Sequence, residues 1–368
     1  MKFSCEKLVL QSALSTASRA VASKSSIPAL EGLLLQCSGE RLTVTGYNMQ
    51  MGIRTGFPCE VSEEGQLVLS ARLFGDIIRR MPDDTVTLTA NDLVVKLHCG
   101  DADFDIVGLP AADFPELPEV EEKDSARIPE KTLKAMIQQT SFAVSTNEAR
   151  PVHMGSLFEV GGNELTVVSV DGFRLAMRKE KLKTVASGIF SFVAPGTALN
   201  EVEKICADTE EEIAITMGDR HIMFETAETL LICRRLEGEF LDYKNAIPRR
   251  NPVSLTVNTR NMIESLERVS VVITEKLKSP VRCLFEDNKV TFTVKTANGD
   301  ARDVCRIAGN GNGLEIGFNN RYLSEALRYA PADMVKLEMN TGISPAIIVP
   351  TDGEENFLYM VLPVRLKA

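Results

Sequence analysis

The side chains that most often carry out catalysis are few and scattered in this sequence. It has three histidines, His98, His153 and His221, and two of them lie in strand-like runs, where a packed or surface histidine is more usual than a base. The sequence has neither a Gly-x-x-x-x-Gly-Lys-Ser/Thr phosphate loop nor a Gly-x-Gly-x-x-Gly dinucleotide fingerprint after a strand. The eight cysteines occur singly, which indicates free thiols of a cytosolic protein rather than a metal centre. The sequence therefore predicts no catalytic centre, no cofactor and no metal site.

Two stretches depart from the pattern of the rest of the chain and are the best candidate sites. In the first, an Asp171-Gly172 turn would bring Phe173, Arg174 and Leu175 to the end of a strand. An enzyme could use Asp171 and Arg174 on an anionic substrate, but the sequence offers no partner base nearby. The second stretch is the apolar C-terminal segment Tyr359–Leu366, whose first half is expected to be a strand.

The elements that would position these stretches follow a repeat. Six predicted helices begin their core-facing stripe about 60 residues apart. Five of them have a second apolar residue four positions later and one has it three positions later, so both residues share a helix face. The first stripe positions are Leu10, Leu73, Leu133, Leu199, Met262 and Leu323, and the second are Leu14, Ile77, Ile137, Val202, Leu266 and Leu327.

Each helix is followed by alternating or β-branched runs separated by Asn, Asp and Gly, which predicts antiparallel hairpins and a β-α-β-β-β unit. After the fifth helix, this pattern predicts a turn at Asp287-Asn288 and a loop at Gly309–Gly313. Two units make a domain of common size, whereas one unit alone is marginal. With breaks at 115–124 and 245–252, the sequence predicts an α+β protein of three similar domains, 1–122, 123–250 and 251–368.

Composition excludes several other classes of protein. With 44% apolar and 25% charged residues the chain is typical of soluble globular proteins, and no apolar run approaches the ~20 residues of a membrane span. The net charge of −10 argues against a nucleic-acid binder. Lysine and arginine recur in the predicted helices, however, so a surface lined by these helices could be basic on an acidic body. The alternative is that helix exteriors carry such residues everywhere.

The Asp171–Leu175 stretch, the C-terminal segment and several further segments give the chain a resemblance to the bacterial DNA polymerase III β subunits, the sliding clamps, over its whole length. No single motif is decisive, but their order and spacing together with the six-fold repeat make the match specific. The matching segments are Met1–Phe3, Ile27–Leu30, Gly108–Pro115, Asp171–Leu175, Glu237–Phe240, Asp242-Tyr243, Ser344-Pro345 and Leu362–Leu366.

The resemblance implies a DNA clamp fold and a non-catalytic, cytoplasmic replication protein. Three domains from each of two chains would close head to tail into a ring, with helices inside and sheets outside. The homodimer interface would include Phe104 and Ile106 on one side and Val271 and Val272 on the other. The ring would encircle duplex DNA without reading its sequence, and Lys24, Arg72, Arg80 and Asn147 would contact it.

The resemblance also implies a peptide-binding groove between domains two and three. Its partners would be the DNA polymerase III α subunit, the clamp loader δ subunit and repair proteins that carry short clamp-binding motifs. The groove residues would be His153, Val170, Gly172, Phe173, Arg174, Leu175, Leu241, Asn319, Tyr322, Ile343, Pro345, Met360, Val361, Leu362, Pro363, Val364, Arg365 and Leu366.

Several positions depart from the usual pattern of the family. His153 stands where an apolar residue is usual, Phe173 where histidine is frequent and Leu241 where proline is usual, while Lys367 and Ala368 extend past the usual end. We therefore expect an altered peptide preference, and mildly pH-sensitive binding if His153 is buried. The alternative function is a diverged, clamp-like docking scaffold that never encircles DNA.

Overall fold

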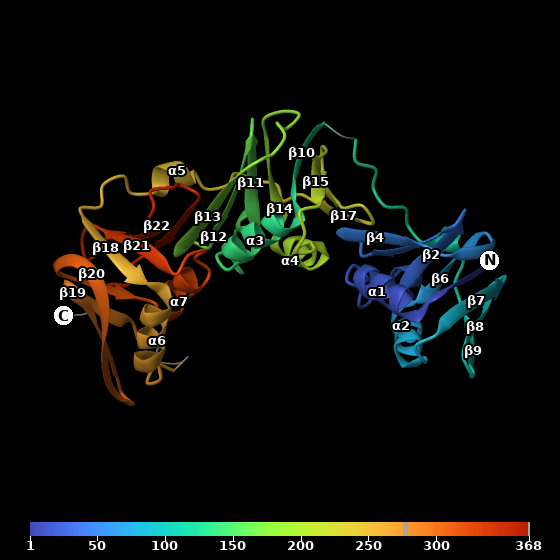
Figure 1. Ribbon diagram of the computed structural model, residues 1–368, viewed down its shortest axis with the longest axis horizontal. Coiled ribbons are helices and arrows are strands. Elements are labelled where there is room, and N and C mark those ends of the chain that lie inside the picture. Colours follow the sequence, from blue (N-terminus) through green and yellow to red (C-terminus); the bar gives the residue numbers. More distant parts are fainter. Residues whose placement is uncertain (122, 275–278, 367–368) are drawn as a thin grey trace. The chain divides into compact units, whose positions relative to one another are not determined.

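The computed structural model describes residues 1–121, 123–274 and 279–366, so the predicted boundary at residue 122 and the extension Lys367-Ala368 lie outside the described part. The chain divides into two compact units (Figure 1). Unit 1 comprises Met1–Lys131, Ala186–Gly188 and Asn200–Arg235, and unit 2 comprises Thr132–Val185, Ile189–Leu199 and Leu236–Ala368.

Unit 1 contains two antiparallel sheets. The five-stranded sheet has the order β5-β1-β7-β8-β9, with bounds β1 Lys2–Glu6, β5 Glu60–Glu63, β7 Thr85–Asn91, β8 Val94–Cys99 and β9 Ala102–Val107. The eight-stranded sheet has the order β10-β15-β16-β17-β4-β3-β2-β6. Its bounds are β2 Gly32–Ser38, β3 Arg41–Tyr47, β4 Met51–Pro58, β6 Gly65–Ser70, β10 Asp124–Pro129, β15 Glu212–Met217, β16 His221–Glu225 and β17 Thr229–Arg234.

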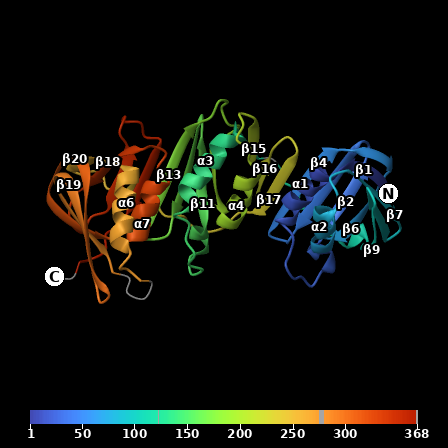
Figure 2. The ribbon, with the colours of Figure 1, turned by 60° about the horizontal axis from the view of Figure 1, so that its bottom comes forward.

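Two helices, α1 (Lys7–Ser18) and α2 (Ala71–Arg80), pack against each other and against the eight-stranded sheet (Figure 2). Two 3-10 turns, η1 (Pro28–Glu31) and η2 (Ala111–Asp113), complete the unit, while α3 (Glu130–Ser141) and α4 (Gly196–Ile205) have residues in both units.

The predicted buried stripe is correct at both positions in five of the six helices, and in α2 it is correct at Ile77 but wrong at Leu73. Leu10, Leu133, Leu199, Met262 and Leu323 are fully buried, but Leu73 is 49% exposed.

In α2 the buried residues are Phe74, Ile77 and Ile78. The Ser70 hydroxyl caps this helix by accepting a hydrogen bond from Leu73 N at 3.4 Å. The buried face is centred on Phe74, Ile77 and Ile78, so Leu73 lies outside it and is exposed.

Unit 2 is built on one ten-stranded antiparallel sheet of order β14-β11-β12-β13-β23-β22-β21-β18-β20-β19. Its bounds are β11 Gly155–Gly161, β12 Glu164–Val170, β13 Arg174–Lys181, β14 Phe190–Pro195, β18 Val253–Asn258, β19 Val281–Thr296, β20 Gly299–Phe318, β21 Met334–Met339, β22 Ala346–Pro350 and β23 Phe357–Val361. Helices α6 (Thr259–Ser270) and α7 (Asn320–Arg328) pack side by side (Figure 2), and η3 (Pro151–Met154) and α5 (Tyr243–Ala246) lie in the connections.

The strands after α6 differ from the prediction. Asp287-Asn288 is not a turn and Gly309–Gly313 is not a loop, because β19 and β20 run through them as one long hairpin. The ladder is irregular at these two places: its register shifts on both sides of Asp287, and Asn288 has a φ of 55°. Pairing across the long hairpin therefore overrides the local turn preference of Asn, Asp and Gly.

The mixed α+β class is confirmed by these sheets and by the recurring strand-helix-strand order. Each unit has its own apolar core. In unit 1 Phe3, Leu10, Leu35 and Phe74 pack together. In unit 2 a core cluster forms around Phe285, Phe292, Phe318 and Tyr359. Among the described residues, no helix is both long and apolar enough to span a membrane.

Candidate functional site

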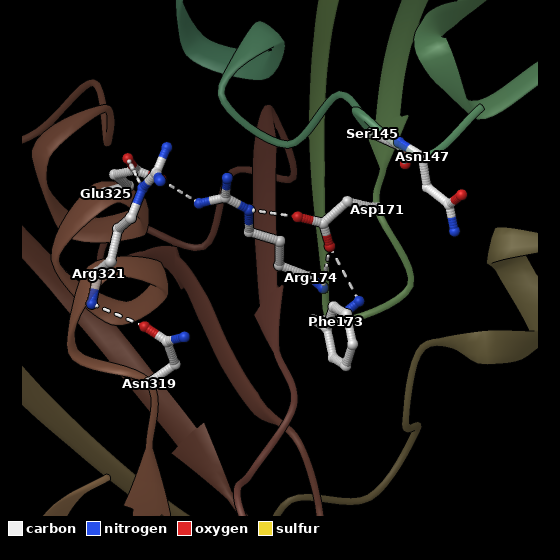
Figure 3. A network of polar contacts seen from close by, with 8 residues as sticks. All are labelled: Ser145, Asn147, Asp171, Phe173, Arg174, Asn319, Arg321 and Glu325. Carbon is white, nitrogen blue, oxygen red and sulfur yellow. Dashed lines mark hydrogen bonds and ion pairs between the residues drawn. The ribbon is translucent and has the colours of Figure 1, made fainter. Parts of the chain in front are cut away.

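The Asp171–Arg174 segment forms a tight turn between β12 and β13 (Figure 3). Asp171 Oδ1 accepts hydrogen bonds from the backbone N–H groups of Phe173 at 2.9 Å and Arg174 at 3.0 Å. Gly172 has a φ of 89°, a conformation that side chains with a Cβ rarely adopt. The turn therefore fixes the backbone on both sides of Phe173, whose ring is 59% exposed.

The Arg174 guanidinium is 6% exposed and lies between two carboxylates (Figure 3). Its Nε donates to Asp171 Oδ2 at 2.9 Å, and its Nη1 donates to Glu325 Oε2 on α7. Arg321 Nε reaches the other oxygen of Glu325 at 2.8 Å. Burial alone would raise the pKa of Glu325, but the hydrogen bonds from Arg174 and Arg321 outweigh it and hold that pKa below its usual value.

Aromatic rings enclose the same guanidinium. Arg174 Cζ lies 4.5 Å from the ring centroid of Tyr322 and 5.3 Å from that of Phe142. Phe173 stacks on Tyr322 with centroids 6.0 Å apart. The buried cation is thus paired with two carboxylates and lies over the faces of two aromatic rings.

The C-terminal strand β23 pairs with β13 and so lies beside the turn that carries Phe173 and Arg174. In the pairing of β13 with β23, Arg174 lies opposite Val361 and Leu175 lies opposite Met360. Beyond the strand, Leu362 N donates to Phe173 O at 2.9 Å and Val364 N donates to Gly317 O at 2.7 Å. An apolar cluster beneath contains Val170, Leu175, Ile347 and Met360.

Most of the predicted groove residues come together here although they are far apart in sequence. Asn319 caps α7 by accepting from Arg321 N at 3.0 Å, and Pro345 directly precedes β22. The last residues run from buried to exposed: Val361 is buried, Leu362, Pro363 and Leu366 are half-buried, and Val364 and Arg365 are exposed. Leu241 and Ile343 are 41% and 78% exposed, and neither belongs to the apolar cluster.

His153 is buried, at 8% exposure, in the 3-10 turn η3. Its ring meets Phe240 edge to face with centroids 5.3 Å apart. Burial lowers the pKa of His153, and the charge of Arg150 lowers it further. This histidine is therefore neutral at pH 7, and Phe240 beside it packs against the apolar cluster.

The basic residues of the helices divide into paired and unpaired groups. Several form ion pairs with acids close by, as Lys7 does with Asp83 at 2.7 Å. The further ion pairs are those of Arg79 and Arg80 with Asp76, Lys131 with Glu210, Lys204 with Glu201, Arg260 with Glu264, Arg268 with Asp303, Arg321 with Glu325 and Arg328 with Glu267.

Of the predicted DNA contacts, Lys24 and Arg72 are exposed, and neither forms an ion pair with another described residue. Arg80 is exposed but pairs with Asp76 at 3.5 Å. Asn147, in unit 2, is exposed, and its Oδ1 accepts from Ala149 N at 3.0 Å. Lys24 and Arg72 are therefore the two predicted cations available to a phosphate.

The predicted interface residues lie at sheet edges and helix ends. Phe104 and Ile106 are on β9, the edge strand of the five-stranded sheet, and Phe104 is 38% exposed. Val271 directly follows α6 and is 81% exposed, whereas Val272 is half-buried.

Sequence reasoning missed the residues that support the site. The sequence predicts no site role for Glu325 or Phe142, and it predicts the turn at Asp171 but not the ion pair of Asp171 with Arg174. The one signal in the sequence was Arg321 four positions before Glu325 on the same helix face. The second partner of Glu325, Arg174, is 151 residues away in the chain, and no local sequence pattern predicts a contact at that separation.

The geometry does not favour catalysis by Asp171 and Arg174. Both Asp171 oxygens accept hydrogen bonds, and Arg174 is buried and paired. No group of described residues is arranged to hold a metal ion. The arrangement instead offers an exposed Phe173 on a hydrogen-bonded turn, two residues from Leu175 of the apolar cluster, and exposed apolar groups beside a few polar ones are typical of a ligand groove.

Comparisons with known proteins agree with this fold. Three family models of the DNA polymerase III beta subunit match this chain: the N-terminal domain model matches residues 1–118, the central domain model residues 127–242 and the C-terminal domain model residues 244–365. A beta sliding clamp of Halalkalibacterium halodurans is 32% identical over 99% of this chain and 100% of its own length.

Solved structures agree over the full length. The sliding clamp of Bacillus subtilis has 28% identity and a TM-score of 0.94, and that of Pseudomonas aeruginosa bound to griselimycin has 25% identity and a TM-score of 0.95. Both matches cover 100% of each chain. This protein therefore has the sliding clamp fold. The chain belongs to the DNA polymerase III β subunit family.

Proposed function

We propose that this protein is a DNA sliding clamp, a processivity factor that encircles duplex DNA and tethers replication and repair proteins. The observation that carries the proposal is the match to named sliding clamps over the full length of the chain. This match favours the clamp over a docking scaffold that never encircles DNA. The protein would be a non-catalytic, cytoplasmic subunit of the polymerase holoenzyme.

The proposed ring is a head-to-tail homodimer, with domains 1–122, 123–250 and 251–368 in each chain. Unpaired edge strands support it, because exposed edges such as β9 and β19 invite pairing with another chain. The apolar residues Phe104 and Val271, exposed in the single chain, would be buried on closure.

The proposed DNA contacts are to phosphates and carry no sequence information. Lys24 and Arg72 would supply charge, Arg80 would contribute if it exchanged Asp76 for a phosphate, and Asn147 would add a hydrogen bond. Lys24 and Arg72 are two cations among the proposed contacts, and so few contacts to phosphates would hold the DNA loosely and let the ring slide.

The proposed docking site is the surface around Phe173, Tyr322 and the C-terminal tail. It would bind short segments of the DNA polymerase III α subunit, the clamp loader δ subunit and repair proteins. Apolar burial supplies affinity there, and the fixed turn at Asp171 limits the ordering cost of binding.

Retention on DNA of different topology tests the proposal. The protein is loaded onto a nicked circular plasmid by a clamp loader with ATP and passed through a gel-filtration column, before and after the plasmid is linearised. A clamp stays with the circle and is lost from the linear form. Loss from both forms, with peptide binding intact, would instead identify the docking scaffold.

A further inference from the structure

A series of contacts between planar groups, here called the stack, connects Phe173 at the docking surface with Tyr329 through the buried Arg174. Phe173 lies on Tyr322 with centroids 6.0 Å apart, and Tyr322 lies 4.5 Å from Arg174 Cζ. Arg174 Cζ lies 5.3 Å from the Phe142 ring, which stacks on Tyr329 at 5.0 Å with a 5° interplanar angle. The exposed fraction is 59% at Phe173 and 38% at Tyr329, but 6% at Arg174 in the middle.

The stack depends on Arg174 keeping its plane. A guanidinium is oriented by the hydrogen bonds that it donates in its plane, and here Arg174 Nε donates to Asp171 and Arg174 Nη1 donates to Glu325. Glu325 is itself held by Arg321 at 2.8 Å (Figure 3). Without the Glu325 charge, one edge of a buried cation would lose its partner, and the guanidinium would tilt toward water.

We propose that Glu325 is a positioning residue for the docking site, acting through Arg174 and Tyr322 on the exposed ring of Phe173. This inference rests on the proposed docking function. Both carboxylate oxygens of Glu325 are engaged inside the protein, since Oε2 accepts from Arg174 and Oε1 accepts from Arg321. Its effect on binding must therefore pass through the stack.

Binding measurements test this role. The probe is a fluorescein-labelled peptide copied from the clamp-binding segment of the cognate polymerase α subunit, followed by fluorescence anisotropy. Glu325→Gln, which keeps the shape and removes the charge, should weaken binding about tenfold. Arg328→Gln is the matched control, because Arg328 lies on α7 as Glu325 does. It removes an exposed ion pair with Glu267 of α6 and should leave the affinity within about twofold.

A double-mutant cycle separates positioning from general destabilisation. If Glu325 acts through Phe173, then Glu325→Gln should cause no further loss of affinity in a Phe173→Ala protein. Two independent losses that multiply would overturn the inference.

The free protein gives a readout that needs no peptide. With 4-fluorophenylalanine at position 173, the fluorine resonance should shift in Glu325→Gln and not in Arg328→Gln. An unmoved resonance overturns the positioning role. A wild-type protein that binds no peptide, with a shifted resonance in the variant, would overturn the docking function and leave the positioning of Phe173 standing.

Discussion

His153 and Phe240 meet edge to face, with ring centroids 5.3 Å apart, although 87 positions separate them in the chain. The histidine is buried in an apolar setting, and burial followed by the Arg150 charge lowers its pKa from 6.5. The neutral ring suits this contact, whereas the protonated ring would be a poorly hydrated cation beside apolar side chains.

We predict that stability and peptide affinity fall together at acidic pH. Above about pH 7.5 His153 is neutral in both the folded and unfolded states and contributes no pH dependence. As the pH falls through 6.5, the unfolded chain takes up the proton before the folded protein does. The free energy of unfolding therefore decreases until the pH passes the lowered pKa of the folded state.

Urea unfolding and peptide titration between pH 5.5 and 8 measure this effect. His221 also has a lowered pKa, from burial and then from Arg234 and Arg220, so the wild-type slope contains both histidines. The difference between wild type and His153→Leu isolates His153. Identical slopes for the two proteins would show that His153 does not titrate in this range.

The orientation of α2 gives a second prediction. Phe74 is fully buried and Leu73 is 49% exposed, so two neighbouring truncations should differ sharply. Phe74→Ala should lower the free energy of unfolding by about 3–5 kcal/mol, and Leu73→Ala by less than about 1 kcal/mol. Chemical unfolding monitored by circular dichroism would compare them. Equal losses would place both side chains in the core and contradict the observed buried face of α2.

The proposed ring gives a third prediction about mass. Wild-type protein in light scattering should have twice the 40.4 kDa chain mass across a concentration series. Val271→Asp should yield folded monomers, because this residue is 81% exposed in the single chain but would be buried on closure. A wild-type monomer at every concentration would mean that no ring forms unaided, and the encirclement of DNA would then need a loader or fail.

The fourth prediction concerns DNA affinity and salt. Each phosphate contact contributes about 0.9 to the slope of log affinity against log salt concentration. Lys24→Ala and Arg72→Ala should each reduce the slope for a short duplex by about that amount. Lys96→Ala, an exposed lysine on β8, serves as the control and should leave the slope unchanged. An unchanged slope in the Lys24→Ala and Arg72→Ala variants would remove those two residues from the DNA surface.

The sequence by itself determined the repeated elements of this protein. Apolar residues three or four apart predicted Leu133 and Ile137 on one helix face, and both are fully buried. The Asp171-Gly172 pair predicted the turn that presents Phe173. These features follow from local sequence, because a helix stripe and an Asp-Gly turn depend on residues a few positions apart.

Tertiary structure decided everything that depends on distant partners. The fused hairpin β19–β20 overrode the local turn signals at Asp287 and Gly309, because a long ladder satisfies more backbone groups than two short ones. Glu325 pairs with Arg174 across 151 positions, and the pair matters because Arg174 is buried and Glu325 is largely shielded from water. No periodicity encodes such a pair, since its energy arises only when packing removes the two charges from water.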